Sequence, residues 1–361
     1  MRLWYRIFLL LVLFGTAYFL TMYNSTGKTI YFRLIVLLFI LTESAQLFRE
    51  IFIKKDRKEI IRNIATILFS IFVLIIFLEA VFMFIPRSHG VGTTLGHKLF
   101  YHKYWNTRNS LGFREREPEK DKDSAILFIG DSFTEGWGLK KVNDRYSDIV
   151  RNAIQSQYPD HCITNIGVSG SETKREYETF IKFLNKTKKK PSKIYLEYFG
   201  NDIISIADSM KPFDGYRVYQ NMPTPFKYAI NSSYFLNFIY WTIPHPGLND
   251  FNKYLNAAYQ DTACFRLHTK ELDRFINFSR QNNVELTMII FPFLTDLEIS
   301  KKTYTNKLIN YFKQKNIQTI DVSDLIKDVP VYKRIINSND QHPSEEVNRL
   351  VANVLIKQLK K

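Results

Sequence analysis

The sequence contains few cysteines and histidines and no metal-binding spacing. Its 361 residues include 2 cysteines and 7 histidines, and neither type recurs at the intervals typical of zinc or other metal sites. We therefore expect no metal. A disulfide between Cys162 and Cys264 is possible, but Cys162 begins a predicted core strand, so a buried free thiol is favoured there.

The sequence also lacks a nucleic-acid-binding signature, although its formal net charge is +15. The densest basic run after residue 88 lies between Lys186 and Lys193. We expect this run to be a solvated turn before a strand, and we expect no nucleic-acid partner. Anionic lipid headgroups or acidic glycans also suit a basic surface. The run consists of Lys186, Lys188, Lys189, Lys190 and Lys193.

The composition changes sharply along the chain. Overall, 24% of the residues are charged and 45% are hydrophobic, which excludes disorder and fibrous repeats as the dominant state. Residues 1–88 are mostly long apolar stretches, whereas the remainder has an ordinary globular composition. This pattern predicts a membrane anchor over residues 1–88, followed by one large soluble domain.

Three apolar segments of the anchor approach the roughly 20 residues that cross a bilayer. The first begins with Arg2 and Arg6 and has no signal-peptidase site after it, so we expect an uncleaved anchor. The positive-inside rule places both the N-terminus and the basic loop 49–62 in the cytoplasm, so the middle segment must span. We expect a multi-pass inner or plasma membrane protein whose chain after Pro86 is extracytoplasmic. The predicted spans are about 3–23, 30–48 and 64–85.

Charged residues within the predicted spans need partners, because charge is costly in a bilayer. Arg33 and Glu79 lie at similar depth when the second and third spans run antiparallel. We predict that they pair, and we favour a structural role over a relay. Glu43 lies nearer the cytoplasm and is expected to snorkel.

Residues 89–123 are predicted to be a connector, and the chain after them alternates between strands and helices. Such alternation is typical of βαβ units with a parallel sheet covered on both faces, whose sites gather at the carboxyl ends of the strands. We predict strands near 125–129, 162–166, 193–198, 285–290 and 318–322, and helices near 146–157, 172–184, 270–281, 302–315 and 344–359.

One segment, about 203–269, does not fit the alternation. An insertion of this size over a strand end is often a lid or a substrate platform. Packing against the core or the membrane face is an equally good interpretation.

Short polar motifs follow three predicted strands. Ser132, in Gly130-Asp-Ser-Phe-Thr-Glu-Gly136, follows the first strand, where a tight turn exposes a serine hydroxyl. Gly170 closes the motif that begins at Asn165, and Asn201 follows Gly200 after the third strand. A glycine N–H and an asparagine amide are donors that can hold an acyl-transfer oxyanion.

A fourth motif, Asp340-Gln-His-Pro343, precedes the last predicted helix. The carboxylate of Asp340 can accept from one nitrogen of His342 while the other nitrogen faces a nucleophile. Asp131, next to Ser132, points elsewhere and is assigned a structural role.

These four motifs resemble those of the SGNH hydrolases, also called the GDSL family. The resemblance implies a flavodoxin-like doubly wound parallel sheet over residues 124–361, with no cofactor. It implies that Ser132 is the nucleophile, that Asp340 and His342 complete the triad, and that the oxyanion donors are Ser132, Gly170 and Asn201; Gly167 ranks below Gly170. The usual last block is Asp-x-x-His, a spacing that here puts Asn339 in the acid position. The preceding segment 109–114 is also similar to a segment found before the first strand in membrane-anchored members of the family. The residues of the segment do not indicate its role.

The resemblance leaves the reaction open between two chemistries. An esterase would hydrolyse acyl, most simply acetyl, esters of an envelope or extracellular polysaccharide or glycolipid. An O-acyltransferase would use a sugar acceptor and a membrane partner that supplies the acyl donor. A non-catalytic envelope scaffold with the same fold is the third alternative.

Overall fold

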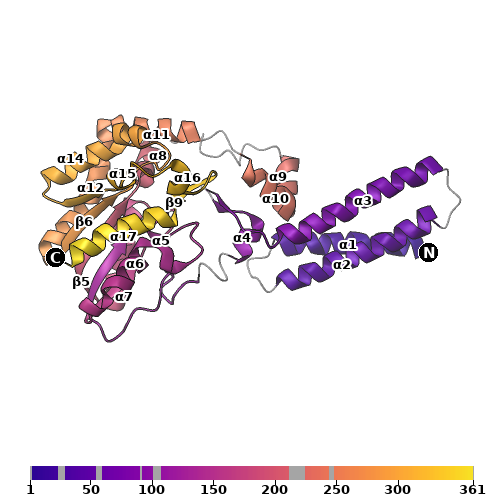
Figure 1. Cartoon of the computed structure of the whole chain (residues 1–361), viewed down its shortest axis with the longest axis horizontal. Coiled ribbons are helices and arrows are strands. Elements are labelled where there is room, and N and C mark those ends of the chain that lie inside the picture. The colour runs from indigo at the N-terminus through magenta and orange to yellow at the C-terminus, as the bar shows by residue number, and fades with distance from the viewer. Residues whose placement is uncertain are drawn as a thin grey trace. The chain divides into compact units, whose positions relative to one another are not determined.

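The computed structural model describes residues 2–22, 29–53, 59–89, 92–100, 107–210, 224–243 and 248–360. The chain divides into two compact units. The helical unit comprises Met1–Tyr104 and Tyr219–Pro244, and the sheet unit comprises Trp105–Val218 and His245–Lys361 (Figure 1). The predicted connector and the predicted insertion are therefore each divided between the two units.

Three long helices form most of the helical unit: α1 (Arg2–Met22), α2 (Thr29–Phe48, continued by a π-helical turn Arg49–Ile53) and α3 (Glu59–Phe82). Among the described residues, α3 is the helix that is long and apolar enough to cross a membrane, with a hydropathy of 2.7. In α1, a shorter stretch, Trp4–Ala17, is apolar. Spanning by α1 and α2 stays a prediction.

Ion pairs join these helices to one another. Arg33 Nη2 of α2 lies 3.5 Å from Glu79 Oε2 of α3, and both side chains are buried, which confirms the predicted pair. Glu43 was expected to extend toward water at the membrane surface. Instead it forms an ion pair, in which its Oε2 lies 2.6 Å from Nη1 of Arg6. A neighbouring arginine satisfies this carboxylate locally.

The helical unit also contains a short hairpin and three shorter helices. These are β1 (Ser88–His89), β2 (Gly92–Thr93), α4 (Leu95–Phe100), α9 (Thr224–Ser232) and α10 (Tyr234–Thr242). Phe82 of α3 packs on Phe235 and Phe238 of α10, with ring centroids 5.3 and 4.7 Å apart. The middle of the predicted insertion thus packs against the N-terminal helices.

The sheet unit is built on five parallel strands in the order β4-β3-β5-β6-β7. The order of a flavodoxin-like fold is the same, and its ligand crevice lies where the order reverses. Here that point lies between β3 and β5. The strands are β3 (Ser124–Ile129), β4 (His161–Asn165), β5 (Lys190–Tyr198), β6 (Glu285–Ile290) and β7 (Gln318–Asp321). The α/β fold with a parallel sheet is confirmed.

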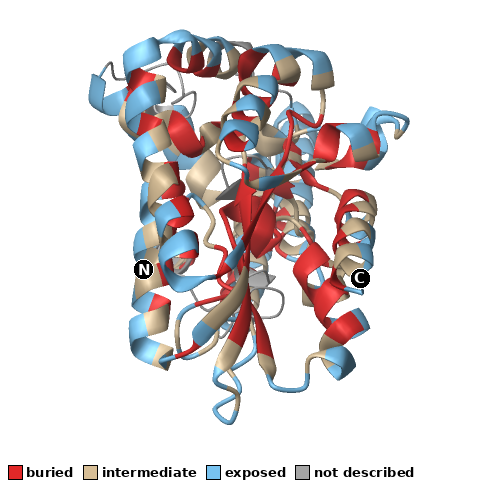
Figure 2. Cartoon of the chain, turned by 90° about the vertical axis from the view of Figure 1, so that its left-hand side faces the viewer, coloured by how far each residue is buried: buried red, intermediate tan, exposed pale blue. Residues whose placement is uncertain are grey.

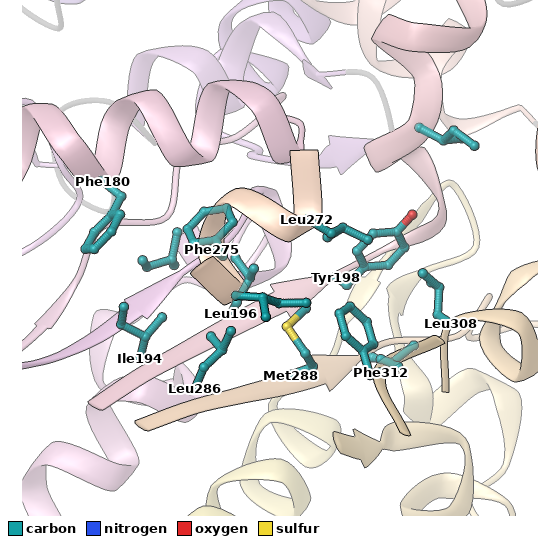
Figure 3. Close-up of a cluster of buried hydrophobic side chains, with 14 of the residues drawn as sticks. Phe180, Ile194, Leu196, Tyr198, Leu272, Phe275, Leu286, Met288, Leu308 and Phe312 are labelled. Carbon is teal, nitrogen blue, oxygen red and sulfur yellow. The ribbon is translucent and has the colours of Figure 1, made fainter. Parts of the chain in front are cut away.

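Helices cover both faces because strand side chains alternate between two cores. Leu127 and Ile129 of β3 enter one core, and Ile126 and Phe128 enter the other. Figure 2 shows the buried strands between helices whose sheet-facing sides are buried, and Figure 3 shows part of the first core. The main helices are α6 (Tyr146–Ile154), α7 (Thr173–Thr187), α12 (Thr262–Asn282), α14 (Asn306–Gln314) and α17 (Glu345–Leu359).

Shorter elements complete the sheet unit. They are α5 (Ser132–Glu135), α8 (Ile204–Met210), α11 (Leu248–Gln260), α13 (Leu297–Ser300), α15 (Val322–Ile326), α16 (Val331–Arg334) and the antiparallel hairpin of β8 (Ile335–Asn337) with β9 (Asp340–Pro343). The sequence patterns did not predict the hairpin.

The prediction that the basic run Lys186–Lys193 is solvated is wrong at one position. Lys189, between α7 and β5, is buried, and its Nζ donates to the carbonyl oxygens of Glu119, at 2.5 Å, and of Lys122. This lysine is held inside because it satisfies backbone carbonyls of the chain leading into β3. Cys162 and Cys264 are both free and buried, as favoured from the sequence.

Candidate active site

Ser132 begins α5 directly after the turn that follows β3. Asp131 caps the helix, because its Oδ1 accepts the N–H of Phe133 at 2.8 Å. Gly130 has no room for a side chain, since a Cβ there would collide with Glu197 and Thr134. The turn therefore places the Ser132 hydroxyl at the carboxyl end of β3, where the sequence predicted it.

The structure brings Ser132, His342 and Asp340 into one line of hydrogen bonds. His342 Nε2 lies 2.8 Å from Ser132 Oγ, and His342 Nδ1 lies 2.5 Å from Asp340 Oδ1. Asp340 is fully buried. A carboxylate beside Nδ1 favours the tautomer in which Nδ1 carries the proton and Nε2 can accept the serine proton.

The hairpin explains why one intervening residue separates the acid from the histidine. Side chains two apart on a strand point to the same face, so Asp340 and His342 of β9 lie side by side. Gln341 points the other way, where its Oε1 accepts the hydroxyl of Thr295 at 3.3 Å. Asn339, which would be the acid under the usual spacing, lies in the two-residue turn between β8 and β9.

Asn201 is joined to the serine turn through Asp131. It follows β5 in a 3-10 turn, Gly200–Ile203, and its Nδ2 donates to Asp131 Oδ2 at 3.0 Å. An amide nitrogen carries two hydrogens, so this bond leaves one N–H for another acceptor. Asp131 thus has the structural role expected of it and also orients Asn201.

Two glycines follow β4, and they lie in different surroundings. A Cβ on Gly167 would come 2.6 Å from the backbone nitrogen of Glu135, and Gly167 N–H donates to Asn165 Oδ1 at 2.9 Å. Gly170 has a φ of +71°, and a Cβ there would meet nothing within 4 Å. Gly167 is therefore a packing position, whereas a side chain at position 170 would meet open space, and the predicted role of the Gly170 N–H stays a prediction.

Glu135 links the loop that carries Gly170 to the nucleophile helix. Its Oε2 accepts the N–H of Ser169 at 2.6 Å, and its Oε1 lies 2.5 Å from Nη2 of Arg108. Glu135 is buried, whereas Arg108 is partly exposed. One carboxylate thus fixes the loop next to α5 while an arginine balances its charge.

The position of Arg114 shows what the segment 109–114 does in the fold. This side chain is buried, and it donates to the carbonyl oxygen of Gly136 at 2.5 Å and to that of Leu139 at 2.7 Å. These carbonyls follow α5, so Arg114 satisfies the backbone at the C-terminal end of the nucleophile helix. The sequence motif alone does not predict this role.

A buried set of four charges lies behind the same turn; we call it the arginine network, and it consists of Glu115, Arg145, Asp148 and Arg151. Asp148 Oδ2 lies 2.6 Å from Arg145 Nε, and its Oδ1 lies 2.8 Å from Arg151 Nη1. Glu115 pairs with both arginines and accepts the N–H of Asn165 at 2.9 Å. The network ties the chain before β3 to α6 and to the end of β4.

A second buried set, the carboxyl cluster, lies on the other elements around the turn and consists of Glu176, Glu197 and Asp202. Glu197 Oε2 accepts the N–H of Asp131 and the hydroxyl of Thr134, each at 3.1 Å. Burial raises the pKa of all three carboxyl groups well above the ordinary range, and neighbouring carboxylates, including Asp131, raise it further. The raised pKa values favour the protonated, neutral form of these side chains.

The turn that carries Asn201 rests on a buried network of aromatic hydroxyl groups. Tyr259 of α11 donates to the carbonyl oxygen of Gly200 at 3.0 Å. Tyr198 OH lies 2.5 Å from Tyr259 OH and 2.7 Å from Nε2 of His268. Burial lowers the pKa of His268 to about 3, so its ring is neutral. The last part of the predicted insertion therefore holds the turn that carries Asn201 in place through a hydrogen bond to its backbone.

No group of His, Cys, Asp or Glu side chains within the described ranges is arranged to hold a metal ion. The arrangement at Ser132 suits acyl transfer through a serine nucleophile, for which side chains and backbone donors suffice.

Comparison with solved structures finds several proteins to which part of this chain is similar. A lipolytic G-D-S-L family protein from Veillonella parvula is 15% identical, with a TM-score of 0.41 over 66% of this chain and 99% of that one. A psychrotrophic esterase from Pseudoalteromonas sp. is 13% identical, with a TM-score of 0.37 over 66% and 97%. A lipase/acylhydrolase from Enterococcus faecalis is 16% identical, with a TM-score of 0.39 over 66% and 95%.

Among curated proteins, none matches this chain in sequence. The family profile of GDSL-like lipases/acylhydrolases matches residues 126–355, which is well over half of the chain. These residues contain Ser132, Asn201 and His342 together with all of the parallel sheet except the first two residues of β3. The chain therefore belongs to the GDSL-like lipase/acylhydrolase family, the SGNH hydrolases.

Proposed function

We propose that this protein is a membrane-anchored, extracytoplasmic serine esterase. Its substrate would be an acyl ester, most simply an acetyl ester, on a polysaccharide or glycolipid of the cell envelope or its surroundings. The line of hydrogen bonds from Ser132 through His342 to Asp340 carries the proposal. Membership of a family of acylhydrolases agrees with it.

The reaction begins when Ser132 Oγ attacks the ester carbonyl carbon and His342 Nε2 takes the serine proton. Asp340 stabilises the resulting imidazolium, since it already lies against Nδ1. The tetrahedral intermediate collapses as Nε2 returns the proton to the leaving sugar hydroxyl. A water molecule then repeats the sequence on the acyl-serine and releases a carboxylic acid.

Three donors would hold the oxyanion: the backbone N–H groups of Ser132 and Gly170 and the side-chain amide of Asn201. The N–H of Ser132 lies in the first turn of α5, where backbone donors lack helical partners. Asn201 is already oriented by Asp131. Removal of one such donor lowers kcat by about a hundredfold or more.

The membrane location rests on the helical unit. The hydropathy and length of α3 suit a span, and α1 and α2 supply two more in the proposed three-helix anchor. The basic residues of loop 49–62 then keep that loop and the N-terminus in the cytoplasm. The sheet unit follows Pro86 and is consequently extracytoplasmic, where envelope glycans are within reach.

Hydrolysis of a chromogenic acetyl ester by the full-length protein in detergent tests the chemistry. We expect Ser132→Ala and His342→Ala to lower kcat/KM by about a thousandfold or more, whereas Ser209→Ala, an exposed serine of the same unit, leaves it unchanged. Full activity in Ser132→Ala would overturn the serine-ester mechanism.

An added oligosaccharide separates the two chemistries. Acetyl transfer to the sugar, followed by mass and dependent on Ser132, would make the protein an O-acyltransferase that uses a membrane acyl-donor partner. A wild-type protein that neither hydrolyses nor transfers would be the non-catalytic scaffold.

A further inference from the structure

The buried pair of the helical unit does more than neutralise itself. Glu79 accepts three donors at the start of α10: the hydroxyl of Ser233, the N–H of Tyr234 at 3.0 Å and the N–H of Phe235 at 3.2 Å. The start of a helix has unpaired N–H groups and a partial positive charge, so a carboxylate is a fitting partner. The α3 helix thus carries the N-terminal acceptor of a helix about 150 residues later in the chain.

Arg33 completes this arrangement. Its Nη2 lies 3.5 Å from Glu79 Oε2, and its guanidinium carbon lies 4.2 Å from the centroid of the Tyr234 ring. The charge of Glu79 is therefore divided between an arginine of α2 and the backbone of α10. We call Arg33 and Glu79 the seat of α10.

The side of α10 away from the seat is apolar and uncovered. Leu236 and Ile239 are 43% and 39% exposed, and their spacing of three residues puts them on one face of the helix. Ile243, directly after the end of α10, is 55% exposed. On the adjoining α9, Phe226 and Tyr228 are also exposed. Soluble surfaces rarely present so many large apolar side chains together.

The same exposure continues along α3. Phe77 is 61% exposed and Phe84, just beyond the end of α3, is 47% exposed, as lipid-facing positions would be. Glu79 lies within one turn of the end of α3, so the start of α10 lies at the depth of the membrane boundary if α3 spans. Tyr240 and Trp241 of α10 are residue types enriched at that boundary.

We propose that α9 and α10 lie in the outer interface of the bilayer, with lipid acyl chains covering Leu236, Ile239 and Ile243. The inference rests on the proposed membrane anchoring and extends it. The chain leaves the membrane after α3, begins the sheet unit, and returns to the membrane surface between α8 and α11. The aromatic stretch 234–241 is then a lipid-binding element rather than a lid over the catalytic serine.

Spin labels in the full-length protein test this in phosphatidylcholine vesicles. With Cys162 and Cys264 replaced by alanine, a label at Ile239→Cys is compared with two matched positions. Phe77→Cys reports the exposed face of α3, and Tyr332→Cys, which is 74% exposed on α16, reports water. The readout is the ratio of collision rates with molecular oxygen, which concentrates in lipid, and with a water-soluble nickel chelate.

We expect the Ile239 ratio to match that of Phe77 and to exceed that of Tyr332 about tenfold. An Ile239 ratio equal to that of Tyr332 would overturn the inference. So would a label shielded from both reagents, which means that another protein surface covers the face. If Phe77 itself reports water, the membrane anchoring fails, and this outcome is distinct from a failure at Ile239 alone.

The seat is tested in the same vesicles. Glu79→Ala removes the acceptor, so the label at position 239 should gain mobility and collide more often with the nickel chelate. Glu79→Gln keeps one acceptor oxygen, so its label mobility should lie between those of the wild type and of Glu79→Ala. Unchanged spectra in Glu79→Ala would refute the role of the seat. Hydrolysis of the chromogenic ester by Ile239→Cys should equal that of the wild type.

Discussion

The two buried charge sets around the serine turn are neutralised in opposite ways. In the arginine network, Arg145 and Arg151 balance Glu115 and Asp148 through direct ion pairs. In the carboxyl cluster, burial and the neighbouring carboxylates both raise the pKa of each carboxyl and so favour its protonated form. A network of fixed charges should be insensitive to pH near neutrality, whereas a cluster held by protons should respond to it.

The difference shows that the serine turn depends on two separate supports. The arginine network holds the chain before β3, the start of α6 and the end of β4. The carboxyl cluster lies directly against the turn through Glu197, which accepts the N–H of Asp131. Loss of the arginine network should therefore lower stability at every pH near neutrality, whereas a change in the carboxyl cluster should alter how stability depends on pH.

The largest effect is expected from Arg145→Met. Removing this arginine leaves Glu115 and Asp148 partly unpaired in a buried site, which costs about 3–5 kcal/mol. We expect a correspondingly lower unfolding midpoint and loss of esterase activity at all pH values. Arg274→Met breaks a partly exposed pair with Glu271 and should cost less than about 1 kcal/mol. Equal losses in the two variants would mean that the network does not support the fold.

An intermediate, pH-dependent effect is expected from Glu176→Gln. The folded pKa of Glu176 is raised, so the stability contributed by its proton is complete below the unfolded pKa of about 4.5 and is lost as pH rises. Glutamine resembles the protonated form and does not titrate. The variant should gain stability relative to wild type as pH rises from about 4.5 toward the folded pKa, with a slope of at most about 1.4 kcal/mol per pH unit, and no further gain above the folded pKa.

Thermal unfolding of both proteins at pH 5 and pH 8 measures this gain. The matched control is Glu178→Gln, an exposed position of the same helix, which should show no pH-dependent difference. A Glu176→Gln variant destabilised equally at both pH values would indicate a charged, paired carboxylate instead.

The smallest effect is expected from Glu135→Gln, which combines features of both sets. The amide oxygen can still accept the N–H of Ser169, but the ion pair with the half-exposed Arg108 is lost. We expect kcat to fall less than about tenfold, or about 1.4 kcal/mol, with KM unchanged. Glu135→Ala removes the acceptor as well and should lower kcat further. Equal kcat values for the two variants would show that Glu135 does not position the loop of Gly170.

Apolar periodicity and strand-end motifs were enough to predict the sheet and the residues around Ser132. The strand Glu285–Ile290 has the predicted bounds, because a short apolar run between two helices has few other structures available. Ser132 and His342 were found from local sequence, although 210 positions separate them. Parallel strands bring their carboxyl ends together, so the motifs of Ser132 and Asn201 meet at one edge of the sheet. His342 reaches Ser132 from the hairpin of β8 with β9.

The hairpin and the carboxyl cluster could not be predicted from sequence in the same way. The β9 strand is polar, and its sequence lacks the apolar alternation that identifies strands. The carboxyl cluster draws its side chains from three separate elements. They become buried together only when the chain folds, so no local pattern marks the three together. The one local signal was Glu197, a carboxylate within the otherwise apolar end of a core strand, which could have indicated a protonated or paired side chain.

The hairpin that carries Asp340 and His342 has a consequence for how such sites diversify. Because the two side chains share one face of a strand, they form a self-contained unit whose geometry does not depend on the residue between them. Gln341 faces the opposite side and touches Thr295 from the segment after β6. Evolution can thus replace residue 341 and change the contact with Thr295 while Asp340 and His342 keep their hydrogen bond on the opposite face of the strand.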